Sequence, residues 1–263
     1  MQPFTIKISK IIDENTSIKT FYFDYNLKSQ PGQFVMLWIP DVDQKPFSIS
    51  FDDGKTFGLT VFKRGPLTEK LFELNLGDRV GITGPFGTSY SIKPDYHYYM
   101  VAGGYGAAPL GNLAERINGA KIDFIVGARS HDLLLFEDRL KKIPNLNLHI
   151  TTDDGSAGTK GRVTDVLEKL LENQNDDKRI LVTCGPELMQ TAVLALANKY
   201  DTECEVSVER HMKCGFGVCG QCVVDDLGIC TCMDGPVMSR TIANQIFELG
   251  KYHRDKTGNI IKF

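Results

Sequence analysis

The sequence predicts an antiparallel β-barrel, then a parallel α/β domain, and last a small cysteine-rich domain. Three observations lead to this fold class. Short β-like runs separated by turns fill the first third of the 263 residues, strands and helices then alternate, and five of the seven cysteines lie within residues 214–232. Hydrophobic residues make up 42% and charged residues 24%, which is typical of folded globular proteins and argues against extensive disorder.

The barrel is predicted from β-like runs at residues 4–12, 18–25, 33–38, 57–62 and 79–83. Tight turns separate most of them, as at Pro31-Gly32, Asp53-Gly54 and Gly77-Asp78. Closely spaced strands of this kind favour an antiparallel barrel. A single short helix over residues 68–75 interrupts the series.

The α/β domain begins after a boundary at residues 93–97. Strands are predicted over residues 98–102, 122–128, 146–151 and 180–183, and helices over residues 109–117, 136–142, 163–171 and 187–198. Regular alternation of strands and helices predicts a parallel sheet. A second boundary lies near residues 205–210, beyond which periodicity disappears.

The cysteine-rich tail contains a possible metal centre. Cys214, Cys219 and Cys222 stand in one glycine-rich loop at the CxxxxCxxC spacing of plant-type ferredoxins, which predicts an iron–sulfur cluster. The glycines between them let backbone amides approach the cluster sulfurs. A fourth thiolate can come from Cys230 or Cys232, and spacing alone does not decide between them.

Two other uses of the cysteines are less favoured. A structural zinc site usually pairs two CxxC knuckles, whereas one loop here supplies three ligands. An odd number of cysteines and no signal peptide argue against a disulfide framework and fit a reducing cytoplasm. No apolar run approaches the roughly 18 residues needed to span a membrane. The net charge of −3, without a basic stripe, gives no reason to expect nucleic acid.

A glycine-rich turn follows the first strand of the α/β domain. Gly103, Gly104 and Gly106 lead directly into a helix that contains Pro109, and such turns let a pyrophosphate approach backbone amides. The pattern is not GxGxxG, so a simple packing turn is the alternative. We expect a nucleotide to bind at this strand end.

Two further strand ends should lie at the same edge of the sheet. Cys184, Gly185 and Pro186 follow the last predicted strand, so Cys184 would face a bound nucleotide, although a buried cysteine there is often inert. Asp153 begins a turn-rich loop that could contact ribose or phosphate, or serve only as a turn.

In the barrel, Lys45, Pro46, Phe47 and Ser48 place a cation, an aromatic ring and a hydroxyl side by side. An aromatic face can stack on a flavin ring, a hydroxyl can reach a ring nitrogen, and an ammonium can meet a phosphate. Taken alone the run is weak evidence, because many strands contain such a combination.

Together these motifs resemble the ferredoxin reductase family over residues 1 to about 205. The tail that runs from Glu209 to Cys222 and ends in Cys232-Met-Asp-Gly-Pro narrows the resemblance to the electron-transfer subunits of dihydroorotate dehydrogenase B. The resemblance implies a flavin barrel over residues 1–95, an NAD-binding domain over residues 96–206 and a [2Fe-2S] domain over residues 207–263.

The same resemblance implies ligands for each cofactor. For FAD they are Lys45, Pro46, Phe47, Ser48, Thr60, Val61, Phe62, Leu67 and Thr68; for NAD(H) they are Gly103, Gly104, Gly106, Pro109, Asp153, Cys184, Gly185 and Pro186; for the [2Fe-2S] cluster they are Cys214, Cys219, Cys222 and Cys232. Cys230 is then spare. The family usually has arginine at Lys45 and often glycine at Leu67, so the contacts with the FAD pyrophosphate should differ here.

The resemblance also implies a function. The chain would pass electrons between NADH and the FMN of a dihydroorotate dehydrogenase catalytic subunit, in pyrimidine (UMP) biosynthesis. We expect a cytoplasmic heterotetramer with two copies of each subunit. One alternative is the flavin and iron–sulfur subunit of a soluble hydrogenase or a nicotinamide-linked ferredoxin oxidoreductase. Another is a zinc-containing nucleotide-binding redox sensor. Arg129 and Ser130 could receive the 2′-phosphate of NADPH, but the resemblance favours NADH.

Overall fold

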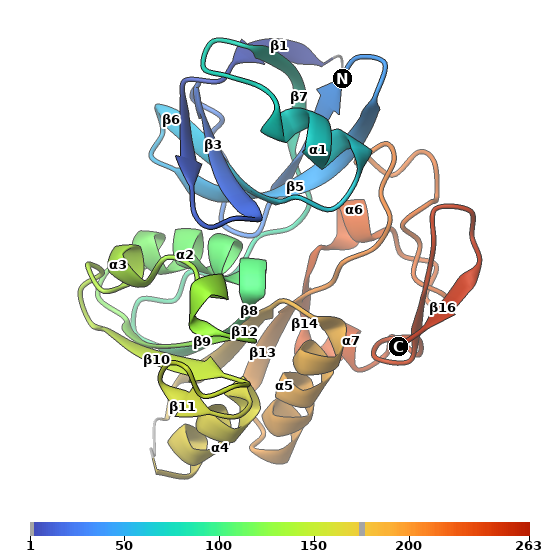
Figure 1. The fold of residues 1–263 in the computed structure, drawn as a ribbon. Coiled ribbons are helices and arrows are strands. Elements are labelled where there is room, and N and C mark those ends of the chain that lie inside the picture. Colours follow the sequence, from blue (N-terminus) through green and yellow to red (C-terminus); the bar gives the residue numbers. More distant parts are fainter. Residues whose placement is uncertain (1–2, 174–176) are drawn as a thin grey trace.

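The computed structural model describes residues 3–173 and 177–263. The barrel lies above the α/β domain, and the C-terminal segment lies beside both (Figure 1). This arrangement confirms the predicted fold class. None of the helices in the described ranges is long and apolar enough to cross a membrane.

Seven strands form one antiparallel sheet that curls into the barrel. They are β1 (Phe4–Lys7), β2 (Lys10–Asp13), β3 (Ile18–Asp24), β4 (Phe34–Ile39), β5 (Asp43–Asp52), β6 (Thr56–Phe62) and β7 (Arg79–Phe86), in the spatial order β1-β7-β4-β5-β6-β3-β2. Fully buried aromatic and aliphatic side chains, among them Phe21, Phe57 and Leu37, fill its interior.

Two elements of the barrel differ from the predicted ranges. The run over residues 4–12 is divided, because the Ile8 amide bonds to the Asp78 carbonyl and the Ser9 amide to the Tyr22 carbonyl. β1 can therefore pair with β7 while β2 pairs with β3. Helix α1 (Pro66–Phe72) begins two residues earlier than predicted, because the Thr68 hydroxyl bonds to the backbone of Gly65 and closes its first turn.

The second sheet has the strand order β11-β10-β9-β8-β12-β13-β14. Its strands are β8 (His97–Gly103), β9 (Lys121–Ala128), β10 (Leu146–Thr152), β11 (Thr159–Lys160), β12 (Arg179–Cys184), β13 (Glu203–Ser207) and β14 (Val237–Ser239). All neighbours are parallel except β14, which runs antiparallel to β13. Because β14 comes from the C-terminal segment, that segment forms one edge of the nucleotide-domain sheet.

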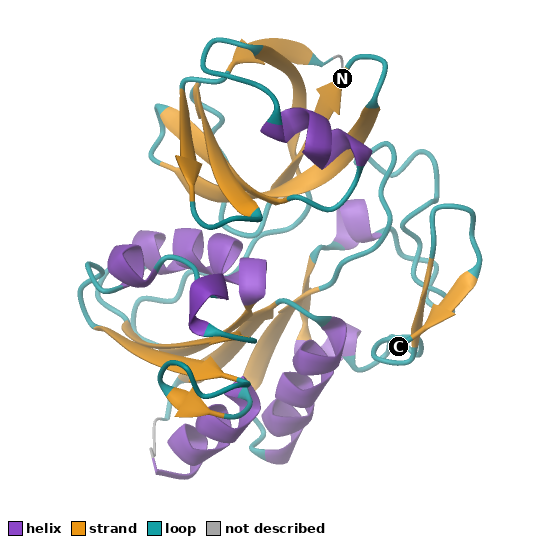
Figure 2. Ribbon diagram, in the orientation of Figure 1, coloured by secondary structure: helices purple, strands orange, loops and turns teal. Residues whose placement is uncertain are grey.

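Helices cover both faces of this sheet (Figure 2). Helix α2 (Ala107–Arg116) packs on the face that carries Tyr98 and Met100, whereas α4 (Val163–Asn173) and α5 (Glu187–Lys199) pack on the face that carries Tyr99 and Val101. Alternate residues of β8 thus point into two cores, as expected of a strand buried on both sides. η1 (Gly104–Gly106) and η2 (His131–Leu133) are short 3₁₀ turns.

Helix α3 (Glu137–Leu140) is shorter than the predicted range of residues 136–142. It begins one residue later because Phe136 has a left-handed backbone (φ 64°) that a helix interior excludes, and it ends two residues earlier. The C-terminal segment is mostly loop, with α6 (Thr231–Asp234), α7 (Arg240–Ala243) and a hairpin of β15 (Tyr252–Arg254) and β16 (Ile260–Lys262) (Figure 2).

Candidate functional site

Two of the predicted nucleotide-binding turns meet at the carboxyl edge of the sheet. Ala102 of β8 pairs with Cys184 of β12, so the turns that follow these strands are neighbours. A Cβ at Gly106 would lie 2.2 Å from the Cys184 carbonyl oxygen, and one at Gly103 would lie 2.5 Å from Pro186 Cδ. The backbones therefore touch at a distance that only glycine permits. We call residues 184–187 the nucleotide loop.

The other predicted nucleotide residues lie close by in the same region. Gly104 has a left-handed backbone (φ 52°), and Pro109 is buried in the first turn of α2. Asp153 lies two strands away from β8, where its amide donates to the Ala128 carbonyl at the end of β9. Asp153 is exposed at the same edge, and the following residue, Asp154, donates its amide to the carbonyl of Arg129, the residue considered for phosphate recognition.

Cys184 is 4% exposed, and its thiol is held in the protonated form. Burial raises the pKa of this thiol to about 12, and the nearby Glu209 carboxylate adds to the shift. A neutral thiol at the nucleotide loop can position a ligand but is not a ready nucleophile.

Glu209, Tyr105 and Arg64 also belong to this region, and they were absent from the predicted site. Tyr105 stacks on Phe62 of the barrel, with ring centroids 6.1 Å apart, and Glu209 together with burial raises the pKa of its hydroxyl to about 12. The Glu209 side chain reaches solvent, yet surrounding protein raises the pKa of its carboxyl and Arg64 opposes that shift. Glu209 stands just beyond the end of β13. Because ligands of such sheets bind at strand ends, this position could have indicated that Glu209 belongs to the site.

The predicted flavin residues lie on three adjoining elements. Lys45, Pro46, Phe47 and Ser48 are half-buried on β5, and the Lys45 ammonium lies 2.8 Å from the Asp43 carboxylate. On β6 the Phe62 side chain is exposed, whereas Val61 points into the barrel core and Thr60 bonds to Thr20 at 2.9 Å.

On helix α1, Leu67 is 3% exposed inside the barrel core, and the Thr68 hydroxyl is bonded to the Gly65 backbone. Val61, Leu67 and Thr68 thus use their side chains within the protein. Any flavin contact at these three positions would come mainly from backbone atoms.

The five cysteines of residues 214–232 lie near one another, and the charge of Cys214 acts on both Cys230 and Cys232. The Cys214 thiol contacts Cys219, and the Cys222 thiol contacts both Cys230 and Cys232. Backbone amides point at two of these sulfurs: Gly217 donates to Cys232 Sγ at 3.2 Å, and Cys232 donates to Cys222 Sγ at 3.4 Å. We call residues 214–222 the cluster loop.

This donor set fits an iron–sulfur cluster. Within residues 3–173 and 177–263, no three metal-ligating side chains surround a single ion position. Two thiolates on each of two irons are the ligand set of a [2Fe-2S] centre, and amides directed at sulfur stabilise it. Cys230 and Cys232 both lie beside Cys222, so either can be the fourth ligand by position.

The thiols differ in their pKa. Burial raises the pKa of Cys214, but hydrogen bonds from the Cys219 and Phe216 backbone outweigh it and lower the value to about 6. Burial, together with the neighbouring Cys222, raises the pKa of Cys232 to about 12. The cluster loop therefore already favours the thiolate form at its first cysteine.

The cluster loop packs against the barrel. Gly215 has a left-handed backbone (φ 84°), and a Cβ there would lie 2.7 Å from Met36 Cγ. Phe34 and Met36 of β4 form a buried cluster with Met212, Cys222 and Cys232. Since Met36 pairs with Pro46 of β5, the cluster loop lies one strand away from the predicted flavin residues.

Comparison with known proteins agrees with this architecture. A family model described as the iron–sulfur cluster binding domain of dihydroorotate dehydrogenase B matches residues 209–241, and an oxidoreductase NAD-binding domain matches residues 100–194. Two relatives are both described as a probable dihydroorotate dehydrogenase B (NAD(+)), electron transfer subunit. The one from Methanocaldococcus jannaschii is 43% identical over 100% of this chain and 99% of its own length. The one from Thermococcus kodakarensis is 42% identical over 88% of this chain and 94% of its own.

Solved structures share the fold. The structure of an NADH-dependent reduced ferredoxin-NADP oxidoreductase superposes with a TM-score of 0.80 at 28% identity, covering 90% of this chain and 88% of that one. A ferredoxin-NADP+ reductase from Plasmodium falciparum, at 17% identity and a TM-score of 0.64 over 76% of this chain and 92% of that one, shares the fold alone. The chain belongs to the family of dihydroorotate dehydrogenase B electron transfer subunits.

Proposed function

We propose that this chain passes electrons from NADH, through FAD and a [2Fe-2S] cluster, to the FMN of a dihydroorotate dehydrogenase catalytic subunit. The observation that carries the proposal is the position of the cluster loop, which packs on β4 directly beside the strand that holds Lys45 to Ser48. When bound, FAD accepts two electrons as hydride from NADH, and the cluster carries electrons singly. The role belongs to pyrimidine (UMP) biosynthesis.

The nucleotide side of the site is built from backbone. Gly103, Gly104 and Gly106 would let the pyrophosphate of NADH approach the amides that precede α2. The nucleotide loop, with Gly185 and Pro186, lies in contact with this turn and would hold the nicotinamide end, with Cys184 beside it. Asp153 follows β10, two strands away from β8 at the same edge, and would contact the ribose.

On the barrel side, β5 supplies the groups that suit a flavin. Phe47 and Ser48 are half-buried, and Lys45 is tied to Asp43 by an exposed ion pair that a phosphate could replace. The other proposed flavin contacts come from β6 and α1, at Thr60, Val61, Phe62, Leu67 and Thr68. Val61, Leu67 and Thr68 would contribute backbone atoms, because their side chains are used within the protein. Phe62 and Tyr105 stack across the two domains, where the nicotinamide and flavin rings would have to meet.

The cluster would be held by Cys214, Cys219, Cys222 and Cys232. Cys219 is exposed, and large apolar side chains stand near it at unusually high exposure: Phe216 (42%), Val218 (76%) and Met233 (52%). Exposed apolar groups around a redox centre suit docking of a partner protein. We assign this surface to the catalytic subunit, in a complex with two copies of each chain.

A cytoplasmic location is part of the proposal, because seven free cysteines suit a reducing compartment. NADH, not NADPH, is the proposed donor. Steady-state rates with the two nucleotides test this choice, and a higher kcat/KM with NADPH would contradict it.

The whole proposal is tested by absorbance and EPR spectroscopy of the purified protein. We expect flavin and iron–sulfur absorption bands, an EPR signal after reduction with dithionite, and bleaching of both chromophores by NADH. A colourless protein that contains zinc and does not reduce dyes with NADH would refute the proposal and favour a redox sensor.

The similarity to an NADH-dependent ferredoxin oxidoreductase, at a TM-score of 0.80, favours one second candidate, the flavin and iron–sulfur subunit of such an enzyme. Both functions predict the same spectra. Affinity purification from the native cells separates them, because a dihydroorotate dehydrogenase catalytic subunit should co-purify if the first is correct.

A further inference from the structure

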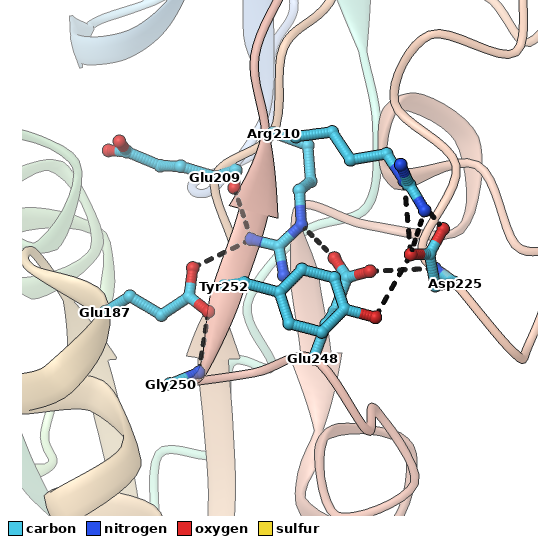
Figure 3. Close-up of polar contacts among 8 residues, drawn as sticks. Glu187, Glu209, Arg210, Asp225, Glu248, Gly250 and Tyr252 are labelled. Carbon is cyan, nitrogen blue, oxygen red and sulfur yellow. Dashed lines mark hydrogen bonds and ion pairs between the residues drawn. The ribbon is translucent and has the colours of Figure 1, made fainter. Parts of the chain in front are cut away.

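A buried arginine joins the nucleotide loop to the segment that follows the cluster loop. The Arg210 guanidinium is 3% exposed and forms ion pairs with Glu187 at 2.8 Å and Glu248 at 2.6 Å, both themselves at least nine-tenths buried. Figure 3 shows Arg210 between these two carboxylates. One cation thus bridges two chain segments that are 61 residues apart in sequence (187 to 248).

The first carboxylate belongs to the nucleotide loop. Glu187 is the first residue of α5 and directly follows Pro186, and its second oxygen accepts from the Gly250 amide at 2.7 Å. Arg210 also donates to the carbonyl of Glu209 at 2.7 Å, so it fixes the backbone of the residue whose side chain lies near Cys184 and Tyr105. The nucleotide side of the site is therefore held by Arg210 at two points.

The second carboxylate, that of Glu248, is hydrogen-bonded to the segment that follows the cluster loop. Glu248 accepts the Asp225 amide at 2.9 Å, and Asp225 comes three residues after Cys222. Asp225 in turn pairs with Arg254 at 2.8 Å. It also accepts from the Tyr252 hydroxyl at 3.1 Å, as Figure 3 shows. Val224, between Cys222 and Asp225, is completely buried in the core shared with the nucleotide domain, so this short stretch has little freedom to move.

We propose that Arg210 is a positioning residue that fixes the nucleotide loop relative to the cluster loop, so that a nucleotide bound at the first also restrains the second. The proposal rests on the proposed function, which gives each loop its ligand. Removing one partner from a buried ion pair leaves an unpaired charge in the interior, which makes the guanidinium difficult to replace. Lysine keeps the charge but lacks the planar guanidinium, whose several N–H groups can bind two carboxylates at once.

The test is hydrogen–deuterium exchange of the purified, cofactor-loaded protein with and without NAD+, followed by mass spectrometry. In the wild type, NAD+ should slow exchange both in residues 184–192 and in residues 222–227. In Arg210→Lys, the slowing should persist in residues 184–192, whereas residues 222–227 should exchange about tenfold faster than in the wild type and no longer respond to NAD+. An arginine with only a structural role would change basal exchange without removing the response to NAD+.

Arg240→Lys is the matched control. Arg240 also anchors α5, but at its far end, where it donates to the Ala197 carbonyl at 3.2 Å and pairs with Asp201 at 2.9 Å. This variant should respond to NAD+ as the wild type does. Two outcomes would overturn the assignment to Arg210. One is that both variants lose the slowing of exchange by NAD+ at residues 222–227, and the other is that Arg210→Lys retains it.

A second variant covers the case in which Arg210→Lys does not fold, as judged from its FAD and iron content. In Glu248→Gln, an amide replaces the carboxylate that accepts from both Arg210 and Asp225, so only the cluster side of the bridge is broken. It should lose the NAD+ response at residues 222–227, and a retained response would refute the inference. Failure of NADH to reduce the wild type would instead refute the proposed function, because NAD+ protection does not depend on electron transfer.

Discussion

At the residue scale, the close approach of the two nucleotide-binding turns depends on Gly106. An alanine Cβ at this position would lie 2.2 Å from the Cys184 carbonyl oxygen, a backbone atom that cannot move away alone. We expect Gly106→Ala to lower the free energy of unfolding by about 3 kcal/mol and to weaken NAD+ binding, because overpacking shifts both turns.

Gly111→Ala, in the same helical region, is the control. Its Cβ would meet only Leu140, at 3.9 Å, and alanine suits a helix interior better than glycine by about 0.5–1 kcal/mol. Urea unfolding and NAD+ titration of the two variants should separate them. Equal stability of the two variants would show that the turns tolerate a Cβ.

Cys230 and Cys232 provide a second test at this scale. Both contact Cys222, but Cys232 is fully buried and accepts the Gly217 amide, whereas Cys230 is only partly buried. We expect Cys232→Ser to lose the visible absorbance of the cluster and Cys230→Ser to keep it. Iron content per FAD measures this directly. If Cys230→Ser alone lost the absorbance, Cys230 and not Cys232 would be the fourth ligand.

Residues differ in how far the sequence could predict their place in the site. Cysteine spacing is local, so Cys214, Cys219 and Cys222 could be recognised without a structure. Glu209, Tyr105 and Arg64 come from three distant parts of the chain and meet only because of the tertiary fold. The burial of Val61 in the barrel core depends on strand alternation, and that of Leu67 depends on which face of α1 packs on the barrel; a motif specifies neither.

At the element scale, a buried carboxylate joins three parallel strands. Asp123 of β9 is 1% exposed and bonds to His97 of β8 at 2.6 Å and to His149 of β10 at 2.7 Å. Burial raises the pKa of Asp123, but hydrogen bonds with His149, His97 and Asn147 outweigh it and hold the pKa well below its ordinary value. A group with a lowered pKa stabilises the fold above its ordinary pKa, and this contribution is lost as the pH falls.

Asp123→Asn should therefore lower the free energy of unfolding by about 3 kcal/mol at neutral pH, since it breaks a buried charged network. The stability difference between wild type and variant should shrink as the pH falls below about 5. Denaturant unfolding at several pH values measures the difference. A difference that stays constant with pH would show that the Asp123 charge does not contribute. Asp13→Asn, at an exposed ion pair with Lys19, is the control and should change stability little.

The sequence predicted the existence of the main elements better than their ends. Alternation of strands and helices was evident from local patterns, and α2, α4 and α5 lie where periodicity placed them. The break between β1 and β2 depends on hydrogen bonds from Ile8 to Asp78, just before β7, and from Ser9 to Tyr22 of β3, and the late start of α3 follows from the left-handed Phe136. Both are effects of tertiary context that override local propensity.

At the scale of the whole molecule, the exposed apolar surface near Cys219 makes a prediction about assembly. Val218 is 76% exposed in the cluster loop, and Val218→Asp would place an unpaired carboxylate in the proposed contact with the catalytic subunit. We expect its affinity for that subunit to fall by more than about tenfold, because burying such a charge costs over about 1.4 kcal/mol.

NADH-dependent reduction of a small dye should be unchanged, since the dye does not need the docking surface. Leu76→Asp, at a 65% exposed position on the barrel, is the matched control and should bind the partner normally. Surface plasmon resonance with the purified catalytic subunit measures both variants. Equal affinities of Val218→Asp and Leu76→Asp for the catalytic subunit would show that the docking surface lies elsewhere on the chain.

The strand β14 also limits how this chain can be rearranged by recombination. The segment that carries the cysteines supplies the edge strand beside β13, and Met238, Ala243 and Ile246 fill one core together with side chains of α4 and α5. A crossover placed between β13 and the cluster loop would thus separate a sheet from its own edge. New partners for this electron carrier should arise more readily by substitutions on the cluster loop than by exchange of the whole C-terminal module.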